Sequence, residues 1–370
     1  MGSNSSDVVI IGGGIIGLSI AWSLASKGAS VTVLERGQVG GQATGAAAGM
    51  LAPLAEAIEP GPFVDLDLAS LRAYPNFVAA LRDETGMDAE LVGPGMLRVA
   101  MTEHDDDSLC AAFAWQRAGG HRVERLSGED VRRLEPAVSP ETMSAILSPE
   151  ERHVEPRRLV RAVALAAANR RVRIVEGAQV TGLDRTGARV DTVHTVAEKF
   201  ACGTAVIAGG AWTQEIGVWL GASFPIAPVR GQILSLLGLR PLFRHTIYTH
   251  SGYLVPKADG RIVVGATEDR AGFDARPTAR GMAALLSMAP TLVPDLAELP
   301  FDTAWAGLRP ASSDGLPILG LIRECENAYI ASGHFRNGIL LAPITGQLLA
   351  QAILSQKQDG IPSAFCPDRF

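Results

Sequence analysis

The chain opens on Asp7-Val8-Val9-Ile10-Ile11-Gly12-Gly13-Gly14-Ile15-Ile16-Gly17, a β-branched run followed at once by glycines. A helical pattern then continues to Lys27, and a second apolar run, 31–34, ends at Glu35. This order of strand, G-x-G-x-x-G turn, helix, strand and acidic residue is typical of a dinucleotide-binding βαβ unit. Residues 7–35 therefore predict that the chain begins with a nucleotide-binding domain.

Each part of this motif has a mechanical reason. Gly12 permits a tight turn, Gly14 lets the backbone approach a pyrophosphate, and Gly17 packs the helix against the strand. The N–H groups at the start of the helix suit phosphate oxygens, and Glu35 stands where a carboxylate can accept ribose hydroxyls. A membrane segment over 8–25 is the alternative. Three consecutive glycines, the lack of a basic flank and a length that barely reaches about 20 residues all disfavour it.

Composition narrows the class of protein. The 370 residues suit two domains or one large composite fold, and 47% hydrophobic with 19% charged residues is an ordinary globular balance. The net charge of −6 comes without a block of like charges, so we expect neither nucleic acid nor a membrane surface as a partner. The four cysteines are widely spaced and residues 1–6 carry no positive charge, which predicts free thiols, no metal site, no signal peptide and a cytoplasmic location.

Strand signals return along the chain in two groups. Buried runs at 204–212 and 328–333, the latter followed by a helix over about 338–354, resemble further parts of the nucleotide domain. Segments in which apolar residues alternate with other residues predict antiparallel strands instead. These segments are 95–100, 231–236, 252–256 and 261–265. The sequence therefore predicts a nucleotide domain in three pieces that alternates with a second domain built on an antiparallel sheet.

Four more segments are specific to fewer protein families than the glycine motif is. They are Ala46-Ala47-Ala48-Gly49-Met50-Leu51, His153-Val154-Glu155-Pro156, Trp305-Ala306-Gly307-Leu308-Arg309-Pro310 and Gly333-His334-Phe335-Arg336-Asn337-Gly338-Ile339-Leu340-Leu341-Ala342-Pro343. With them the chain resembles the flavin amine oxidases of the D-amino acid oxidase and sarcosine oxidase superfamily, and most of all the glycine oxidases of thiamine biosynthesis. The resemblance extends over nearly the whole chain and implies FAD, rather than NAD, and two-electron oxidation of an amine.

The resemblance also implies a mixed α/β and α+β fold of the D-amino acid oxidase type. A discontinuous Rossmann-type FAD-binding domain would comprise 1–80, 150–220 and 305–370, and an antiparallel-sheet substrate domain would comprise 81–149 and 221–304. The residues implied in FAD binding are Gly12, Gly14, Ile15, Ile16, Gly17, Glu35, Arg36, Thr44, Ala46, Ala47, Gly49, Met50, Val180, Ala208, Gly209, Trp212, Arg309, His334, Arg336, Asn337, Gly338 and Ile339.

Two of these regions have a physical rationale. The resemblance implies that 37–51 touches the flavin, and its small side chains, mostly within 40–49, would let the backbone lie against a flat ring system, although a flexible loop or an alanine helix would show the same composition. Residues 338–341 are expected to open the C-terminal helix, whose N-terminus would face the pyrimidine edge of the flavin and stabilise negative charge there.

Three residues are implied in catalysis. Arg309 could take a substrate carboxylate through two parallel hydrogen bonds, although the residues alone also allow an internal ion pair. Tyr253 aligns with a tyrosine that meets the carboxylate, although a strand tyrosine can equally be a core residue. Arg336 aligns with an arginine beside the flavin, where it could support the cofactor or gate the site rather than grip the substrate.

The predicted substrate pocket, Ser251, Glu268 and Met50, departs from the family pattern at two positions. Ser251 stands where a histidine is expected, and Glu268 where a methionine is expected. Residues 309–316 lack the cysteine to which sarcosine oxidases attach FAD, so we expect noncovalent FAD.

The resemblance thus predicts oxidation of glycine or an N-substituted glycine, with a small amine and oxygen as partners and a homo-oligomeric enzyme. A D-amino acid dehydrogenase or oxidase and a noncatalytic flavoprotein are the alternatives. The dehydrogenase would want an amphipathic membrane anchor, and the arginines and the tyrosine argue against the flavoprotein without activity.

Overall fold

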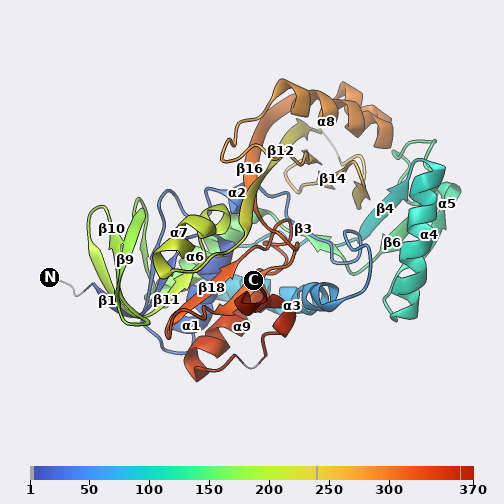
Figure 1. Ribbon diagram of the computed structural model, residues 1–370. Coiled ribbons are helices and arrows are strands. Elements are labelled where there is room, and N and C mark those ends of the chain that lie inside the picture. Colours follow the sequence, from blue (N-terminus) through green and yellow to red (C-terminus); the bar gives the residue numbers. More distant parts are fainter. Residues whose placement is uncertain (1–3, 239–240, 359) are drawn as a thin grey trace.

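The computed structural model describes residues 4–238, 241–358 and 360–370, and two eight-stranded sheets organise them (Figure 1). The first sheet has a parallel centre in the order β18-β11-β1-β2-β8, with β17 antiparallel beside β18 and with β10 and β9 added antiparallel beside β11. Its strands are β1 (Ser5–Ile11), β2 (Val31–Leu34), β8 (Arg173–Val175), β9 (Val180–Thr186), β10 (Arg189–Thr195), β11 (Lys199–Ile207), β17 (Ile318–Leu321) and β18 (Ala328–Ser332).

The second sheet is mostly antiparallel and follows the order β16-β12-β15-β14-β13-β4-β6-β5. Its strands are β4 (Met96–Ala100), β5 (Glu124–Ser127), β6 (Ser144–Ser148), β12 (Ile226–Leu237), β13 (Thr246–Thr249), β14 (Gly252–Pro256), β15 (Arg261–Gly265) and β16 (Phe301–Ser312). A short pair, β3 (Met50–Leu51) with β7 (Arg152–His153), completes the strands of the described chain. The antiparallel strands predicted near residues 95, 231, 252 and 261 are confirmed.

Helices cover both sheets. They are α1 (Ile15–Ala25), α2 (Ala43–Ala46), α3 (Pro62–Thr85), α4 (Glu103–Ala118), α5 (Gly128–Leu134), α6 (Pro156–Asn169), α7 (Thr213–Leu220), α8 (Ala279–Leu292) and α9 (Ala342–Ser355), with short 3₁₀ turns η1 (Gly210–Trp212), η2 (Pro294–Glu298), η3 (Ser363–Phe365) and η4 (Pro367–Arg369). Among the described helices, none is long and apolar enough to cross a membrane.

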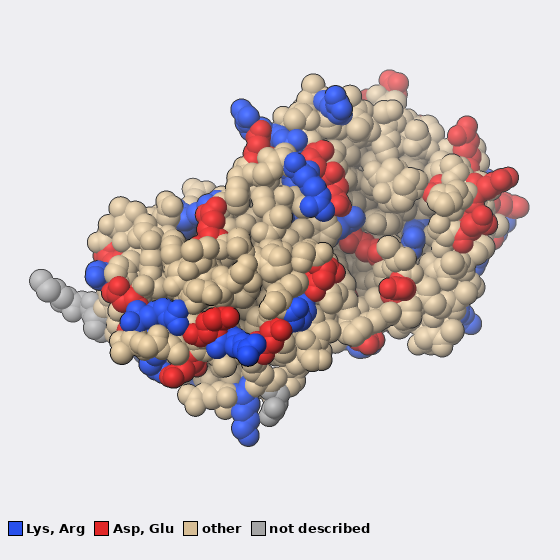
Figure 2. Space-filling model, in the orientation of Figure 1, with Lys and Arg blue, Asp and Glu red and all other residues tan. Residues whose placement is uncertain are grey.

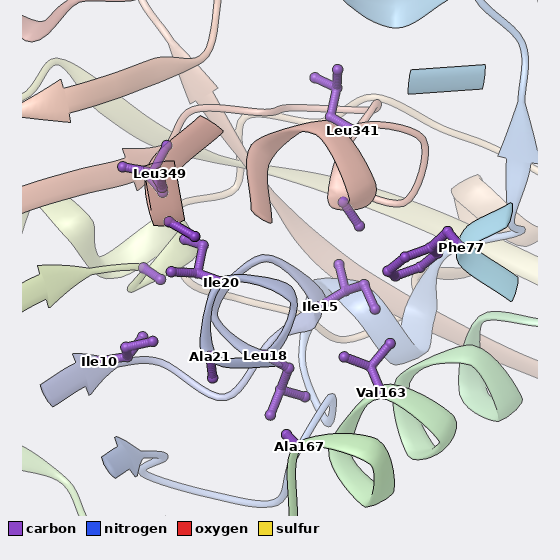
Figure 3. Close-up of a cluster of buried hydrophobic side chains, with 14 of the residues drawn as sticks. Ile10, Ile15, Leu18, Ile20, Ala21, Phe77, Val163, Ala167, Leu341 and Leu349 are labelled. Carbon is purple, nitrogen blue, oxygen red and sulfur yellow. The ribbon is translucent and has the colours of Figure 1, made fainter. Parts of the chain in front are cut away.

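The N-terminal βαβ unit is the centre of the first sheet. β1 and β2 pair in parallel from Val8 opposite Val31 to Ile11 opposite Leu34, with α1 as the crossover. α1 is buried between α9 and α6, where Ile20 points toward Leu349 and Leu18 lies beside Ala167 (Figure 3). The almost entirely apolar α1, in which Ser19 and Ser23 are the polar residues, is therefore explained by burial in protein.

Two elements cross the bounds expected for the domains. α3 continues past residue 80 to Thr85, because its apolar face packs against α6 and α9 beside the first sheet. β16 begins at Phe301, ahead of the expected boundary at 304/305, and pairs with β12 along its length in the second sheet. β16 carries Arg309, and it therefore brings this residue from the second sheet to the space between the sheets.

The visible surface carries charges of both signs. Figure 2 shows Lys and Arg side chains interspersed with Asp and Glu over the part formed by the first sheet. Acidic side chains gather where Figure 1 places α4 and α5, whose first turns contain Glu103, Asp105, Asp106, Glu129 and Asp130. These acids stabilise the helix N-termini, with capping boxes at Thr102 and Ser127.

Candidate active site

One long cavity collects nearly all the predicted site residues. Its lining comes from both sheets, and it includes every residue assigned above to FAD except Gly17. Gly17 lies behind the glycine turn, where a Cβ atom would overlap with the carbonyl oxygen of Gly12. Its role is therefore to let α1 approach β1, as the motif predicts.

The glycine turn forms one end of this cavity. Gly12 has φ +118°, and a Cβ there would overlap with the carbonyl of Ala208 on the neighbouring β11 side, so only glycine fits. Gly14 is the N-cap of α1 and provides no side-chain cap within the described chain, while the N–H of Ile15 donates to Thr44 Oγ1 at 3.1 Å. This arrangement leaves a helix N-terminus that suits an anionic group.

Glu35 is fixed beside that turn. Its side chain is buried, Oε2 accepts the N–H of Gly13 at 2.7 Å, and Oε1 accepts the N–H of Gly37 at 2.8 Å. Each carboxylate oxygen has a second lone pair, so Glu35 can still accept two hydroxyl groups from the cavity. The ribose contact of Glu35 stays a prediction, and the remaining lone pairs leave room for it.

The same end of the cavity has an aromatic wall. The Arg36 guanidinium carbon lies 3.4 Å from the centroid of the Trp212 ring, which in turn stacks on Phe273 at 5.3 Å. Phe273 follows β15 in the second sheet, whereas Trp212 follows β11 in the first. This layered contact joins the two sheets next to Glu35.

The segment 42–50 forms a wall of small side chains. Trp305 Nε1 donates to the carbonyl of Ala46 at 2.9 Å, and Lys257 Nζ donates to the carbonyls of Ala48 and Val154 at 2.7 and 2.8 Å. Burial lowers the pKa of Lys257 to about 8. The segment is helical over Ala43–Ala46, so the alternative of an alanine helix describes one turn of it, and these contacts hold the segment in place.

The C-terminal part of the lining differs from expectation. α9 begins at Ala342, not at Gly338, and residues 338–341 form turns in which Leu341 N–H donates to the Asn337 carbonyl at 2.8 Å. Pro343 in the first turn of α9 sets this later start. His334 lies within 3.1 Å of Thr345 Oγ1, and burial lowers its pKa to about 3, which keeps the ring neutral.

Arg309 and Tyr253 meet in the second sheet. Arg309 Nη1 donates to the carbonyl of Thr267 at 3.0 Å, and its positive charge near Tyr253 opposes the rise in the Tyr253 pKa that burial causes. Two glycines make this contact possible. A Cβ at Gly231 would overlap with the Arg309 guanidinium, and a Cβ at Gly265 would lie 2.5 Å from Tyr253 Cζ. A carbonyl, rather than a carboxylate, holds Arg309, which leaves its charge for a group in the cavity.

Arg336 bridges three elements at the other side of this space. Its Nε lies 3.3 Å from Glu56 Oε2, Nη2 lies 3.5 Å from Tyr248 Oη, and Nη1 lies 4.0 Å from Glu268 Oε2. Its side chain is 30% exposed, while that of Glu268 is 56% exposed. The pairing with Glu56 fits a supporting or gating role better than a grip on substrate.

Two members of the predicted substrate pocket lie apart from the lining. Ser251 is exposed in the turn between β13 and β14, where its Oγ lies 2.9 Å from Thr249 Oγ1. Ser251 does not line the cavity, so the expectation that it borders the cavity is corrected. Glu268 stands at the rim, across from Arg336, and Met50 lines the cavity.

Comparison with known proteins identifies the family. Residues 7–352 match the family of FAD dependent oxidoreductases. The chain belongs to this FAD dependent oxidoreductase family. FAD is accordingly its cofactor, the protein is an oxidoreductase, and the D-amino acid oxidase-like fold is confirmed.

The relatives of this oxidoreductase include named oxidases. Glycine oxidase of Geobacillus kaustophilus (strain HTA426) is 36% identical over 349 residues, 94% of this chain and 92% of the relative. A crystal structure of glycine oxidase from Geobacillus kaustophilus has a TM-score of 0.95 at 34% identity and covers 99% of both chains. A crystal structure of iminodiacetate oxidase from Chelativorans sp. BNC1 has a TM-score of 0.88 at 28% identity, covering 97% of this chain and 98% of that one.

The residues present fit FAD. The glycine turn and the N-terminus of α1 suit the pyrophosphate, Glu35 suits the ribose, and the small-residue wall at 42–50 leaves room for a flat ring. None of the four cysteines, all in the described part of the chain, lines the cavity.

Sequence reasoning missed Glu56 and Tyr248. Glu56 follows the small-residue segment in an irregular stretch, and Tyr248 lies in a buried strand, so neither stands in a periodic or motif context. Only the fold shows that both meet Arg336.

Proposed function

We propose that this FAD-dependent oxidoreductase oxidises glycine or an N-substituted glycine to an imine that hydrolyses to glyoxylate. The observation that supports this most is the pair Arg309 and Tyr253, which presents a guanidinium and a hydroxyl inside a cavity that also contains the dinucleotide motif. A carboxylate is the group that such a pair recognises. The family supplies amine oxidation as the chemistry.

Arg309 anchors and orients the substrate. A guanidinium has five N–H donors, and the bond to Thr267 uses one of them, so the others can make two parallel bonds to a carboxylate. Tyr253, which stays protonated because burial raises its pKa, can donate its hydroxyl to the same carboxylate. Fixing one end in this way limits the orientations of the Cα–N bond and turns an encounter into a positioned reaction.

When bound, FAD would supply a two-electron acceptor for the hydride that leaves Cα, and reoxidation by oxygen would give hydrogen peroxide. The substrate amine must be neutral, because its nitrogen lone pair forms the C=N bond as the hydride leaves. Water then adds to the imine, giving glyoxylate with ammonia from glycine, or with the free amine from an N-substituted glycine. Buried His334 stays neutral, so it adds no charge to this region.

The nitrogen substituent is the variable part of the proposed substrate. Glu268 does not line the cavity and lies 4.0 Å from Arg336 Nη1, so it sets no charge preference for this substituent. The likeness to an enzyme named iminodiacetate oxidase supports a secondary amine, since iminodiacetate is an N-substituted glycine. We therefore propose that glycine is a weaker substrate than at least one N-substituted glycine.

A peroxide assay with glycine, sarcosine, N-ethylglycine and D-alanine tests this function. We expect peroxide and glyoxylate in equal amounts from sarcosine or N-ethylglycine, with a higher kcat/KM than for glycine. The highest kcat/KM for glycine would reject the N-substituted preference, and the highest for D-alanine would indicate a D-amino acid oxidase. Flavin reduction by D-alanine without peroxide would indicate a dehydrogenase, and no reduction by any amine would indicate a noncatalytic flavoprotein.

We also propose a cytoplasmic homo-oligomer. The free thiols of Cys110, Cys202, Cys325 and Cys366 support a reducing compartment. Sedimentation of the purified holoenzyme measures the assembly state, and a monomer would reject the oligomer.

A further inference from the structure

We propose that Asp269 is a positioning residue for the substrate carboxylate, acting on Arg309 through Thr267. This inference rests on the proposed function, because Arg309 matters here as the carboxylate anchor. Neither Asp269 nor Thr267, both in the described chain, lines the cavity, so each would act without touching substrate.

Thr267 is the link between the two charged residues. Its carbonyl accepts a hydrogen bond from Arg309 Nη1 at 3.0 Å, and its hydroxyl donates to Asp269 Oδ2 at 2.8 Å. Its own N–H donates to the Gln232 carbonyl at 3.2 Å. The direction of the Thr267 carbonyl, and with it the plane of the guanidinium, therefore depends on where Asp269 holds the hydroxyl.

Asp269 is itself bound tightly to β12. Its N–H donates to the Arg230 carbonyl at 2.9 Å, and its carbonyl accepts from Arg230 N–H at 2.8 Å. Oδ2 also accepts from Gln232 Nε2 at 2.7 Å and lies 3.5 Å from Arg230 Nε. Arg230 and Gln232 flank Gly231, the residue on which the Arg309 guanidinium rests. Residues 230–232 of β12 therefore provide both the glycine that lies against the Arg309 guanidinium and the side chains that hold the loop with Thr267 and Asp269.

An ionised carboxylate is the group this position requires. Three donors converge on Oδ2, from Thr267, Gln232 and Arg230, and these interactions hold the pKa of Asp269 below its usual value although partial burial opposes the shift. The primary amide of an asparagine would present to these three donors either an NH₂ group, which cannot accept a hydrogen bond, or one neutral oxygen. The Gln232 side chain is buried, so its amide would lose its partner without gaining water.

The test compares Asp269→Asn with Asp274→Asn in the holoenzyme. Asp274 lies in the same loop and its side chain pairs with Arg276; it reaches Arg230 Nη1 only at 4.0 Å and, among the described residues, makes no hydrogen bond to Thr267, Gln232 or Arg309. We expect Asp269→Asn to raise the KM for sarcosine about tenfold while kcat changes less than about threefold, since the Thr267 carbonyl would no longer hold the Arg309 guanidinium in the plane that both bonds to the carboxylate require. The dissociation constant of glycolate, a carboxylate without an amine, measured from the flavin spectrum, should rise in parallel. FAD content should match wild type, and Asp274→Asn should leave all values unchanged.

A double-mutant cycle with Arg309→Lys separates positioning from general damage. Asp269→Asn should cost little further kcat/KM once the guanidinium fork is gone, because the two residues act on one contact. Additive losses in the cycle, an unchanged glycolate constant, or equal losses in the Asp274→Asn control would overturn the inference while leaving the proposed function intact. If wild-type enzyme neither binds glycolate nor oxidises sarcosine, the proposed function itself fails.

Discussion

The guanidinium group of Arg309 lies directly against Gly231, the residue of β12 that faces Gly307 across the β12–β16 pairing. Arg309 itself faces Val229, so its side chain extends along the strand toward Gly231. Any side chain at 231 would occupy the space of the guanidinium. The substrate anchor thus depends on a residue that has no chemistry of its own.

Gly231→Ala is therefore expected to act like a loss of Arg309. The added methyl group cannot coexist with the guanidinium, which must swing away from Tyr253. We expect kcat/KM for sarcosine to fall at least tenfold, about 1.4 kcal/mol, with FAD still bound because the dinucleotide motif lies elsewhere. Steady-state kinetics and the flavin-to-protein ratio measure both effects. Normal kinetics would show that Arg309 has another productive position.

Arg309→Ala should lose turnover and retain FAD. Removing a charge-assisted contact to a carboxylate costs about 2–5 kcal/mol, which lowers kcat/KM by a factor of at least about 30. Arg309→Lys should remain poor, since an ammonium cannot reproduce the planar fork. Arg276→Lys, at an exposed site in the 266–278 loop, is the matched control and should behave as wild type. Near-normal kinetics in the alanine variant would mean that another residue holds the carboxylate.

FAD should be released completely by acid. The cavity contains no cysteine in the described chain, so no thiol stands ready for attachment. Trichloroacetic acid precipitation should leave a colourless pellet and FAD in the supernatant, as chromatography can verify. Yellow colour retained in the washed pellet would contradict noncovalent binding.

Glu151 should make stability depend on pH. Its Oε1 accepts the N–H groups of Leu54 and Ala55 at 2.5 and 3.0 Å, just before Glu56, and burial raises its pKa to about 8. Between the ordinary pKa of a glutamate and about 8, the folded protein keeps a proton on Glu151 that the unfolded chain has released. The free energy of unfolding therefore falls as the pH rises through this range.

Glu151→Gln removes this titration and keeps an acceptor for both N–H groups. We expect a Tm close to that of wild type at pH 5 and higher by at least about 3 °C at pH 8.5. Glu150→Gln, at the exposed neighbouring position, should show no such divergence. A wild-type and Glu151→Gln difference that is the same at both pH values would show that Glu151 does not bind a proton in this range.

Local patterns predicted the parts of the fold that local sequence determines. The turn from Gly12 to Gly17 and the acid at Glu35 lie within one βαβ unit, so their spacing alone defines their geometry. Arg309 and Tyr253 came from the family resemblance, since a strand arginine and a strand tyrosine carry no pattern of their own. No sequence pattern predicted the contacts between segments that are far apart in the chain. Glu56 meets Arg336 only because the irregular stretch before α3 and the turns before α9 converge on one cavity.

The most direct measurement is anaerobic mixing of the holoenzyme with sarcosine and with dimethylamine, followed through the flavin absorbance. Both are secondary amines with an N-methyl group, but only sarcosine has a carboxylate for Arg309 and Tyr253. We predict full bleaching of the flavin by sarcosine, with glyoxylate formed, and no bleaching by dimethylamine at the same concentration. Equal bleaching by both amines, or none by sarcosine, glycine and N-ethylglycine, would contradict it.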